Sequence, residues 1–266
     1  MHVHFLDPYV SRTSPIHALD PRVKFVLTLA FILTVSLTPA QAWPIYILLL
    51  SLILSIEILS NLGLRYVQKR AMLAFPFVLA AFPVIFTIPG TSLFSLSVGE
   101  WTLVVSQEGL ARFAGIALKS WISVQAAIVL TATTPFPDLL VAMRAVRTPR
   151  LMVAVFGLMW RYLFVLADEV LRLLRARSAR SGELGIPGVK SGGSLAWRAR
   201  VAGGMAGSLF LRAFERSDRI YMAMLSRGYD GEVRALPLPP LKSWHLLALG
   251  IGLILDILFL LAALLI

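Results

Sequence analysis

Residues 245–266 read HLLALGIGLILDILFLLAALLI, and this stretch decides the class of the fold. It is 22 residues long, contains no Lys or Arg, and has Asp256 as its one acidic residue. A transmembrane helix needs about 20 consecutive, mostly apolar residues to cross the hydrocarbon core of a bilayer. We therefore expect residues 245–266 to form a membrane-spanning helix.

The composition of the whole chain supports an integral membrane protein. The 266 residues are 58% hydrophobic and 15% charged, and the mean hydropathy is +0.80. A soluble domain is about 45–50% apolar and about 25% charged. Because so many apolar side chains cannot all be hidden in one core, lipid is the solvent that accepts them. The chain has no cysteine, which excludes disulfides, thiolate metal sites and cysteine nucleophiles.

Four further apolar runs precede the last one, at residues 23–38, 43–59, 71–89 and 110–133. The first two are slightly short for a span and predict a helical hairpin with a tight turn. The third contains Pro76 and Pro83 and predicts a kinked helix, since neighbouring helices can satisfy the carbonyls that proline frees. Residues 90–108 are polar and rich in turn formers, and we expect a loop there.

Basic residues are distributed unevenly and predict the orientation of the spans. Of the 25 Lys and Arg residues, 17 lie between residues 135 and 242. The N-terminal head and residues 65–70 are also basic, whereas the loops at Pro39 and 90–108 contain no Lys or Arg. Cytoplasmic loops of membrane proteins carry the excess of basic residues. This predicts five spans with the N-terminus in the cytoplasm and the C-terminus outside.

The basic region contains two long amphipathic patterns. Apolar residues recur every three or four positions from Leu151 to Leu166 and again from Leu195 to Met224, and such spacing indicates one buried stripe on a helix. Charged residues interrupt both patterns, so we expect neither helix to cross the membrane and both to lie on its inner face. Residues 137–146 predict a shorter helix leading into them.

The fold class expected is an all-α integral membrane protein with about five transmembrane helices plus long amphipathic cytoplasmic coupling helices. The expected division is an N-terminal cytoplasmic segment with four transmembrane helices at 1–134, a cytoplasmic coupling-helix region at 135–242 and a C-terminal transmembrane helix at 243–266.

No enzyme signature is present, and we expect the chain not to be an enzyme itself. His2 and His4 could ligate a metal, but a polar tail is the preferred interpretation, and no His-x-x-x-His pattern or carboxylate pair supports a metal site. Ionisable residues within spans are functional suspects by default. Glu57, Lys119 and Asp256 are too few and too dispersed to predict a proton or ion pathway.

Two short motifs end the long helices: RARSARSG at 175–182 and LSRGYDG at 225–231. One interpretation is helix capping, because a basic last turn complements the helix dipole and glycine ends the helix. The other is partner docking, because small neighbours let a guanidinium at a helix tip enter a groove and pair with a carboxylate. The residues alone leave both open.

The chain resembles, over nearly its whole length, the transmembrane coupling (T) component of energy-coupling-factor ABC transporters, most closely the cobalt-type CbiQ family. The order of elements matches, with four spans, coupling helices and one span. The stretches that carry the resemblance are HALDPRVK (17–24), ATTPFPDLL (132–140), RYLFVLADE (161–169) and, most specifically, AMLSRGYDG (223–231).

The resemblance implies that two motifs, each an arginine between small residues, dock on a pair of cytoplasmic ATPases. The second motif falls on Ser226, Arg227 and Gly228. The first departs from the family's Ala-Arg-Gly form, because serine replaces glycine, and two frames fit. We expect the frame Ala179, Arg180 and Ser181, which ends the helix, and keep Arg177 of the other frame in reserve.

The resemblance also implies the partners: two cytoplasmic ABC ATPase subunits that bind the ATP, and a cobalt-type substrate-binding membrane subunit (S component). A small accessory membrane subunit is a further candidate. No cofactor or metal is expected in this chain, and no nucleic acid is expected as a partner. The implied location is the bacterial inner membrane, with the cytoplasmic N-terminus derived above.

The function implied is the transmission of ATPase motion to the substrate-binding subunit, with cobalt ion as cargo and nickel or a vitamin as the alternative. A self-contained secondary transporter is a second alternative, but it would need inverted repeats and broken helices with ionisable groups at mid-membrane. A membrane-embedded enzyme is a third, and it would need clustered His, Asp or Glu near an interface.

Overall fold

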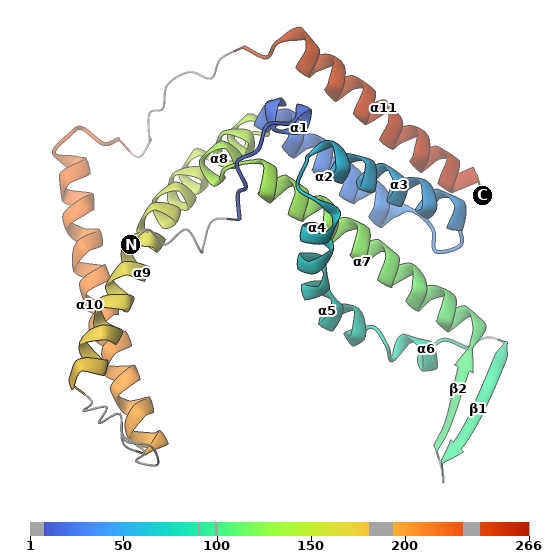
Figure 1. The fold of residues 1–266 in the computed structure, drawn as a ribbon, viewed down its shortest axis with the longest axis horizontal. Coiled ribbons are helices and arrows are strands. Elements are labelled where there is room, and N and C mark those ends of the chain that lie inside the picture. The colour runs from blue at the N-terminus through green and yellow to red at the C-terminus, as the bar shows by residue number, and fades with distance from the viewer. Residues whose placement is uncertain (1–7, 90, 99–100, 181–193, 231–239, 266) are drawn as a thin grey trace. The chain divides into compact units, whose positions relative to one another are not determined.

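The computed structural model describes residues 8–89, 91–98, 101–180, 194–230 and 240–265. Their packing divides the chain into two units. We call residues 8–146 with 240–265 the membrane unit, and residues 147–180 with 194–230 the two-helix unit. Each is described by itself. Figure 1 shows that both are built almost wholly of helices.

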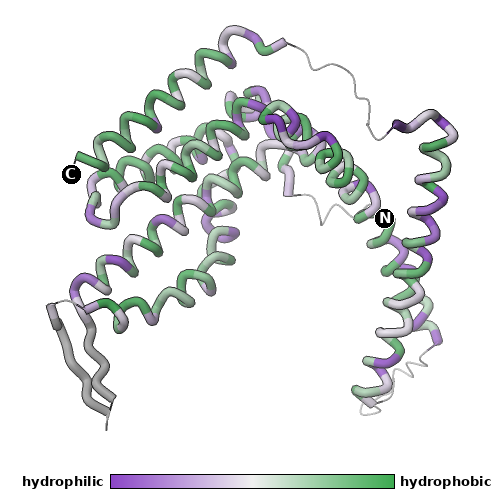
Figure 2. Tube along the Cα trace, turned by 180° about the vertical axis from the view of Figure 1, so that it is seen from behind, coloured by the Kyte–Doolittle hydropathy of each residue, from purple (hydrophilic) through white to green (hydrophobic). Residues whose placement is uncertain are grey.

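The membrane unit is built around α2, α3, α7 and α11, which pack on one another. Val35, Leu49 and Ile122 are fully buried at the centre of this group. Large apolar side chains also cover the outside, and the colouring of Figure 2 shows hydrophobic residues along almost the whole of α11. Its helices are α1 (Pro15–Ala18), α2 (Pro21–Leu37), α3 (Trp43–Leu59), α4 (Leu64–Ala71), α5 (Phe75–Ala80), α6 (Val84–Thr87), α7 (Gln107–Thr133), α8 (Phe136–Ala145) and α11 (Ser243–Leu265).

An apolar core with an apolar exterior is what a helical membrane protein requires, so the expected fold class is confirmed. Within the described part of the chain, four stretches are long and apolar enough to cross a bilayer: Leu64–Thr87, Gln107–Thr133, Arg150–Arg180 and Ser243–Leu265. Three of these correspond to expected spans. The two other expected spans are α2 and α3, each an apolar helix of 17 residues.

The stretch Arg150–Arg180 corrects one expectation, because charged residues were expected to exclude it as a crossing helix. It forms one continuous helix, α9, and it meets the length and composition of a membrane span. The reason is where the charges fall. Up to Ala167 only Arg150 and Arg161 are charged, and the other charged residues follow from Asp168 onward.

The third span was expected to be a kinked helix, and the structure divides it into several short helices. After α4 the chain forms a short 3₁₀ helix at Met72–Ala74, then α5, and then a turn before α6. Pro76 lies in the first turn of α5, where its missing N–H removes no helical bond, and Pro83 precedes α6. In the turn, the amide of Ala81 donates to the carbonyl of Val78 at 3.0 Å, so the break keeps its backbone hydrogen bonds.

Residues 90–108 were expected to form a loop, and this was wrong. The structure has a two-stranded antiparallel hairpin, β1 (Ser92–Val98) and β2 (Trp101–Ser106), with a bulge between Ser92 and Phe94. The segment contains two apolar and β-branched runs separated by Gly-Glu at 99–100. Two such runs joined by two residues that include glycine favour a hairpin.

Helix α7 begins immediately after this hairpin. Its third residue, Gly109, occupies a position that leaves no room for a side chain. The hydroxyl of Ser106 accepts a hydrogen bond from the amide of Gly109 at 3.0 Å and donates to the carbonyl of Ile88 at 2.6 Å. A Cβ on Gly109 would lie 2.6 Å from the carbonyl oxygen of Ile85. The close approach fixes α7 against the end of the broken span.

The other end of α7 is closed by residues from the N-terminal part of the chain. Lys24 is 7% exposed, and its Nζ donates a hydrogen bond to the carbonyl of Thr133 at 3.0 Å. The amide of Val10 donates to the carbonyl of Ala132 at 3.0 Å. The last carbonyls of a helix have no partner within the helix and carry partial negative charge. A buried ammonium therefore stabilises this helix end.

We predict that Lys24→Met destabilises the membrane unit, because methionine keeps the apolar stem of the side chain but leaves the Thr133 carbonyl buried without its donor. The expected loss is about 1–3 kcal/mol in the free energy of unfolding. Unfolding of the purified protein in detergent, followed by circular dichroism, measures it. Lys69→Met on the exposed face of α4 is the matched control. Equal stability of the two variants would contradict the role assigned to Lys24.

Candidate functional site

The candidate site lies on the two-helix unit, formed by α9 (Arg150–Arg180) and α10 (Leu195–Leu225), each 31 residues long. Figure 1 shows the two helices side by side and running in opposite directions. No residue of either helix is fully buried. Apolar contact is made by one stripe on each helix, and with Arg216 these stripes line a half-open cavity of about 210 Å³, whose other lining residues are Leu158, Tyr162, Leu166, Ala213, Ser217 and Ile220.

An ionic cluster joins the two helices near the middle of α9. The carboxylate of Glu169 accepts a hydrogen bond from Arg212 Nη1 at 3.3 Å through Oε1, and one from Arg216 Nη2 at 3.2 Å through Oε2. The side chain of Glu169 is only 13% exposed. Hydrogen bonds in which both groups are ionised are among the strongest in proteins. The cluster therefore ties α9 to two successive turns of α10.

Sequence reasoning missed this cluster. It noted the charged residues only as interruptions of the apolar patterns. A signal was present, since Arg212 and Arg216 are four residues apart and so share one face of α10. The acidic partner comes from 43 residues earlier, and only the packing of α10 against α9 brings it close.

The tip of α10 places the second motif in a defined backbone structure. The amide of Gly228 donates to the carbonyl of Leu225 at 2.9 Å, and that of Tyr229 donates to the carbonyl of Met224 at 3.0 Å. These two bonds form a Schellman motif, with Gly228 in the left-handed conformation at φ 79°. Ser226 donates its hydroxyl to the carbonyl of Ala223 at 3.0 Å.

The tip geometry leaves Arg227 available. Ser226, Arg227 and Gly228 are all exposed. Within the described residues, the guanidinium of Arg227 makes no hydrogen bond or ion pair. The residues on either side of Arg227 thus make the hydrogen bonds of the helix cap. Capping therefore accounts for Gly228 but not for the arginine. Capping and docking are therefore compatible at this tip.

The tip of α9 carries the first motif. Ala179 and Arg180 are exposed in the last turn, and Arg177 of the same turn is half-buried. The remaining residue of the expected frame, Ser181, lies outside the described residues. Like Arg227, Arg180 makes no hydrogen bond or ion pair within the part of the chain that the structure describes. The choice between the two frames stays a prediction.

Because α9 and α10 run in opposite directions, their C-terminal tips lie at opposite ends of the two-helix unit. Arg180 and Arg227 are therefore separated and not gathered into one pocket. Purple and green alternate along α10 in Figure 2, which reflects its polar and apolar faces. The arrangement presents two separate basic ends on one stiff body, and this suits two binding sites on a partner better than one.

Glu57, Lys119 and Asp256, the ionisable residues noted within spans, have separate surroundings in the described part of the chain. Lys119 donates to the carbonyl of Ser36 at 2.8 Å, so it is paired with backbone. Glu57 is fully buried in α3 next to Gln125 of α7, whose amide can donate to Glu57 Oε1 at 3.3 Å. Each of these residues therefore has a structural contact of its own.

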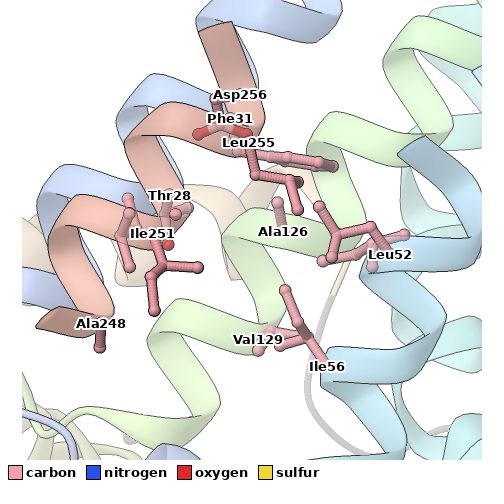
Figure 3. A pocket seen from close by; sticks show the side chains of 13 residues that line it. Thr28, Phe31, Leu52, Ile56, Ala126, Val129, Ala248, Ile251, Leu255 and Asp256 are labelled. Carbon is pink, nitrogen blue, oxygen red and sulfur yellow. The ribbon is translucent and has the colours of Figure 1, made fainter. Parts of the chain in front are cut away.

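Asp256 is 5% exposed and lies at the edge of a cavity of about 380 Å³ between α2, α3, α7 and α11. Figure 3 shows that apolar side chains make up most of its wall, among them Phe31, Leu52 and Ile251. A single carboxylate in an apolar lining is not enough to define an ion site, which requires several oxygen or nitrogen ligands.

The described histidines have structural partners. His17 Nε2 lies 3.1 Å from the carbonyl of Val10, and Nδ1 of His245 accepts a hydrogen bond from the amide of Asp20 at 3.2 Å. Desolvation lowers the pKa of His17, although its contact with the Val10 carbonyl acts in the opposite direction. His2 and His4 lie outside the described residues. Within those residues, no three His, Asp or Glu side chains cluster as a metal site would require.

Comparisons with known proteins identify the family of the chain. The family model described as cobalt transport protein, CbiQ, matches residues 12–237, which includes both long helices and their tips. The match begins in the N-terminal head and ends after α10. It therefore covers most of the chain.

Two transporter names recur among the curated relatives. The energy-coupling factor transporter transmembrane protein EcfT of Lactococcus lactis is 28% identical over 84% of this chain and 83% of that protein. The EcfT of Thermanaerovibrio acidaminovorans is 29% identical over 92% of this chain and 91% of that protein. The cobalt transport protein CbiQ of Salmonella typhimurium is 28% identical over 80% of this chain and 91% of that protein. The chain belongs to the CbiQ family of cobalt transport proteins, as a multi-pass transmembrane component of energy-coupling-factor transporters.

Proposed function

We propose that this chain is the coupling subunit of an ATP-driven importer, and that it transmits the motion of two cytoplasmic ATPase subunits to a separate substrate-binding membrane subunit. The observation that carries the proposal is the pair of exposed arginines, Arg180 and Arg227, at opposite ends of two long, joined helices. Two ATPases related by a two-fold axis offer two equivalent grooves. One tip can enter each.

The chemistry of the tips supports docking to acidic grooves. A guanidinium is planar, always charged, and pairs with carboxylates through two parallel hydrogen bonds. The flanking residues are small, so the tip can approach another protein closely. At α10 the Schellman motif supplies the backbone partners, which leaves Arg227 free for a partner's carboxylate. ATP binding would draw the ATPases together and move the tips with them.

The remaining parts of the proposal follow from charge and composition. The excess of basic residues between residues 135 and 242 supports a cytoplasmic side for the tips of the two long helices, while the first part of α9 is apolar enough to enter the bilayer. The chain would lie in the bacterial inner membrane with its N-terminus inside. The coupling subunit would perform no catalysis, because ATP hydrolysis belongs to its partners. The membrane unit would hold the substrate-binding subunit, and the cargo would be the cobalt ion.

The first prediction concerns both tips. Replacing Arg180 and Arg227 together by glutamate should abolish ATP-driven uptake by the assembled complex, because a carboxylate would repel the acidic grooves. Loss of one charge-assisted hydrogen bond at each tip corresponds to at least about tenfold weaker binding of the ATPases per tip. Copurification of the ATPases with the tagged chain and uptake into proteoliposomes measure the two effects.

Arg219→Glu is the matched control, since Arg219 is 69% exposed on α10 and distant from the tip. It should copurify and transport normally. Normal uptake by the double tip variant would contradict the proposed coupling. So would labelling of cysteines at positions 180 and 227 by an impermeant reagent added outside intact cells.

The second prediction concerns the shape of the α10 tip. Gly228→Ala should weaken uptake, because a side chain in the left-handed conformation costs roughly 1 kcal/mol and opposes the Schellman motif that orients Arg227. Gly204→Ala is the control, since Gly204 lies within α10 with open space around it and should gain about 0.5–1 kcal/mol of helix stability. Thermal unfolding and uptake of both variants are compared. A Gly228→Ala variant that equals wild type in both measurements would refute the assignment.

The third prediction concerns cargo. The complete complex in proteoliposomes should accumulate radioactive cobalt when ATP is inside with the ATPases, and excess unlabelled cobalt should compete more strongly than nickel. The chain reconstituted alone should accumulate neither ion. Uptake by the chain alone would support the secondary transporter instead, and preference for nickel would change the assigned cargo while leaving the coupling role intact.

A further inference from the structure

We infer that Glu169 is the positioning residue of the two-helix unit, a clamp that fixes the register at which α9 and α10 cross and so sets where the two arginine tips lie. This inference rests on the proposed function and deepens it. Glu169 lies between α9 and α10 and not at either tip. It would act through the orientation of Arg180 and Arg227.

The geometry of the clamp specifies both position and direction. The two carboxylate oxygens of Glu169 bind different arginines, Arg212 at 3.3 Å and Arg216 at 3.2 Å. These arginines are four residues apart, or about 6 Å along α10. A single contact would fix one distance and let α10 rotate or slide. Two contacts one turn apart fix a position along the helix as well as its facing side.

The surrounding packing is too loose to set the register without the clamp. Neither helix contains a fully buried residue. A cavity of about 210 Å³ lies on one side of the cluster, among apolar side chains, and one of about 320 Å³ lies on the other, lined by Arg172, Leu173 and Ala176 as well as the cluster itself. Apolar contact is non-directional, so it can hold the helices together at several registers. The charged hydrogen bonds distinguish among them.

The clamp lies at equal distances from the two tips. Arg180 is 11 residues beyond Glu169 on α9, and Arg227 is 11 residues beyond Arg216 on α10. At 1.5 Å per residue, each arm is about 16 Å long. Because the helices run in opposite directions, the arms extend to opposite sides of the clamp. A slip of one turn at the clamp would therefore displace a tip by about 5.4 Å, which is more than a hydrogen bond can span.

Two members of the cluster, Glu169 and Arg216, are partly shielded from solvent, whereas Arg212 is 56% exposed. Glu169 is 13% exposed, and Nη1 of Arg216 is buried without a hydrogen-bond partner among the described residues. Removal of the carboxylate would leave both guanidiniums of α10 without their partner on α9, while Arg172 of α9 lines the same cavity. Like charges would then face each other across the two helices, so the arms should separate or slide rather than stay at the same register.

The first experiment measures the arms directly. The chain contains no cysteine, so Leu174→Cys and Met222→Cys, both at exposed positions on the two arms, give one defined pair of spin labels without any background replacement. Pulsed electron paramagnetic resonance on the full chain in the assembled complex should show one narrow distance. With Glu169→Gln, we expect this distance to be lost in favour of a broad distribution, and uptake to fall about tenfold or more as the charge-assisted bonds are lost.

Two further variants separate positioning from simple stability. Glu215→Gln removes a carboxylate whose ion pair with Arg219 is 69% exposed at both ends, and it should change neither the distance nor uptake. Glu169→Arg alone should broaden the distance further. Combined with Arg212→Glu and Arg216→Glu it inverts the cluster, and it should restore both the narrow distance and a substantial part of the lost uptake. Rescue by inverted charges is not expected of a residue that serves only general stability.

The outcomes distinguish this inference from the proposed function. A narrow, unchanged distance in Glu169→Gln would overturn the clamp. A broadened distance with normal uptake would also overturn it, since positioning would then not matter for coupling. Failure of the proposed function is recognised separately, by normal uptake when Arg180 and Arg227 are both replaced by glutamate while Glu169 is intact.

Discussion

The structure of the membrane unit depends on how the ends of its helices satisfy their backbone groups. In hydrocarbon an unsatisfied carbonyl costs several kcal/mol, so each helix end needs a partner. At the C-terminal end of α7 the partners are the ammonium of Lys24 and the amide of Val10. At the end of α3, Arg12 donates to the carbonyl of Asn61 at 2.6 Å. The N-terminal residues thus contact the ends of two helices, α3 and α7.

The two-helix unit follows a different rule. Its helices are long and partly polar, and neither contains a fully buried residue. Apolar packing alone therefore does not fix how the two helices are aligned. Specificity comes from a small number of directional contacts, namely the bonds of Glu169 to two arginines and the Schellman motif that ends α10. A core of close-packed side chains resists sliding at every point. In this unit we assign the resistance to sliding to the cluster of Glu169 with Arg212 and Arg216. Both arginine tips are exposed.

Most helices of the membrane unit could be predicted from the sequence, because a helix that crosses lipid needs a long run of apolar residues. Runs of about 20 apolar residues identified α7 and α11, and Pro76 and Pro83 predicted a kink in the third span. The hairpin at 92–106 was missed because strand signals of six or seven residues are weak beside helix signals. Helix α9 was expected to lack an apolar run long enough to cross the membrane because of its charged residues. Most of these residues lie in its second half, and up to Ala167 only Arg150 and Arg161 are charged. The partnership of Glu169 with Arg212 and Arg216 could not be predicted, since it depends on which faces of two helices meet.

The break in the third span has a mechanical consequence. Each amide in the turn between α5 and α6 bonds three residues back, as Ala81 does to Val78 and Phe82 to Leu79. Bending there can change the angle between segments without exposing a polar group to the acyl chains. A continuous α-helix would have to break bonds to do the same. The departures from α-helical hydrogen bonding in this span thus lie at residues 72–74 and 81–83, whereas α7 and α11 are each one continuous helix.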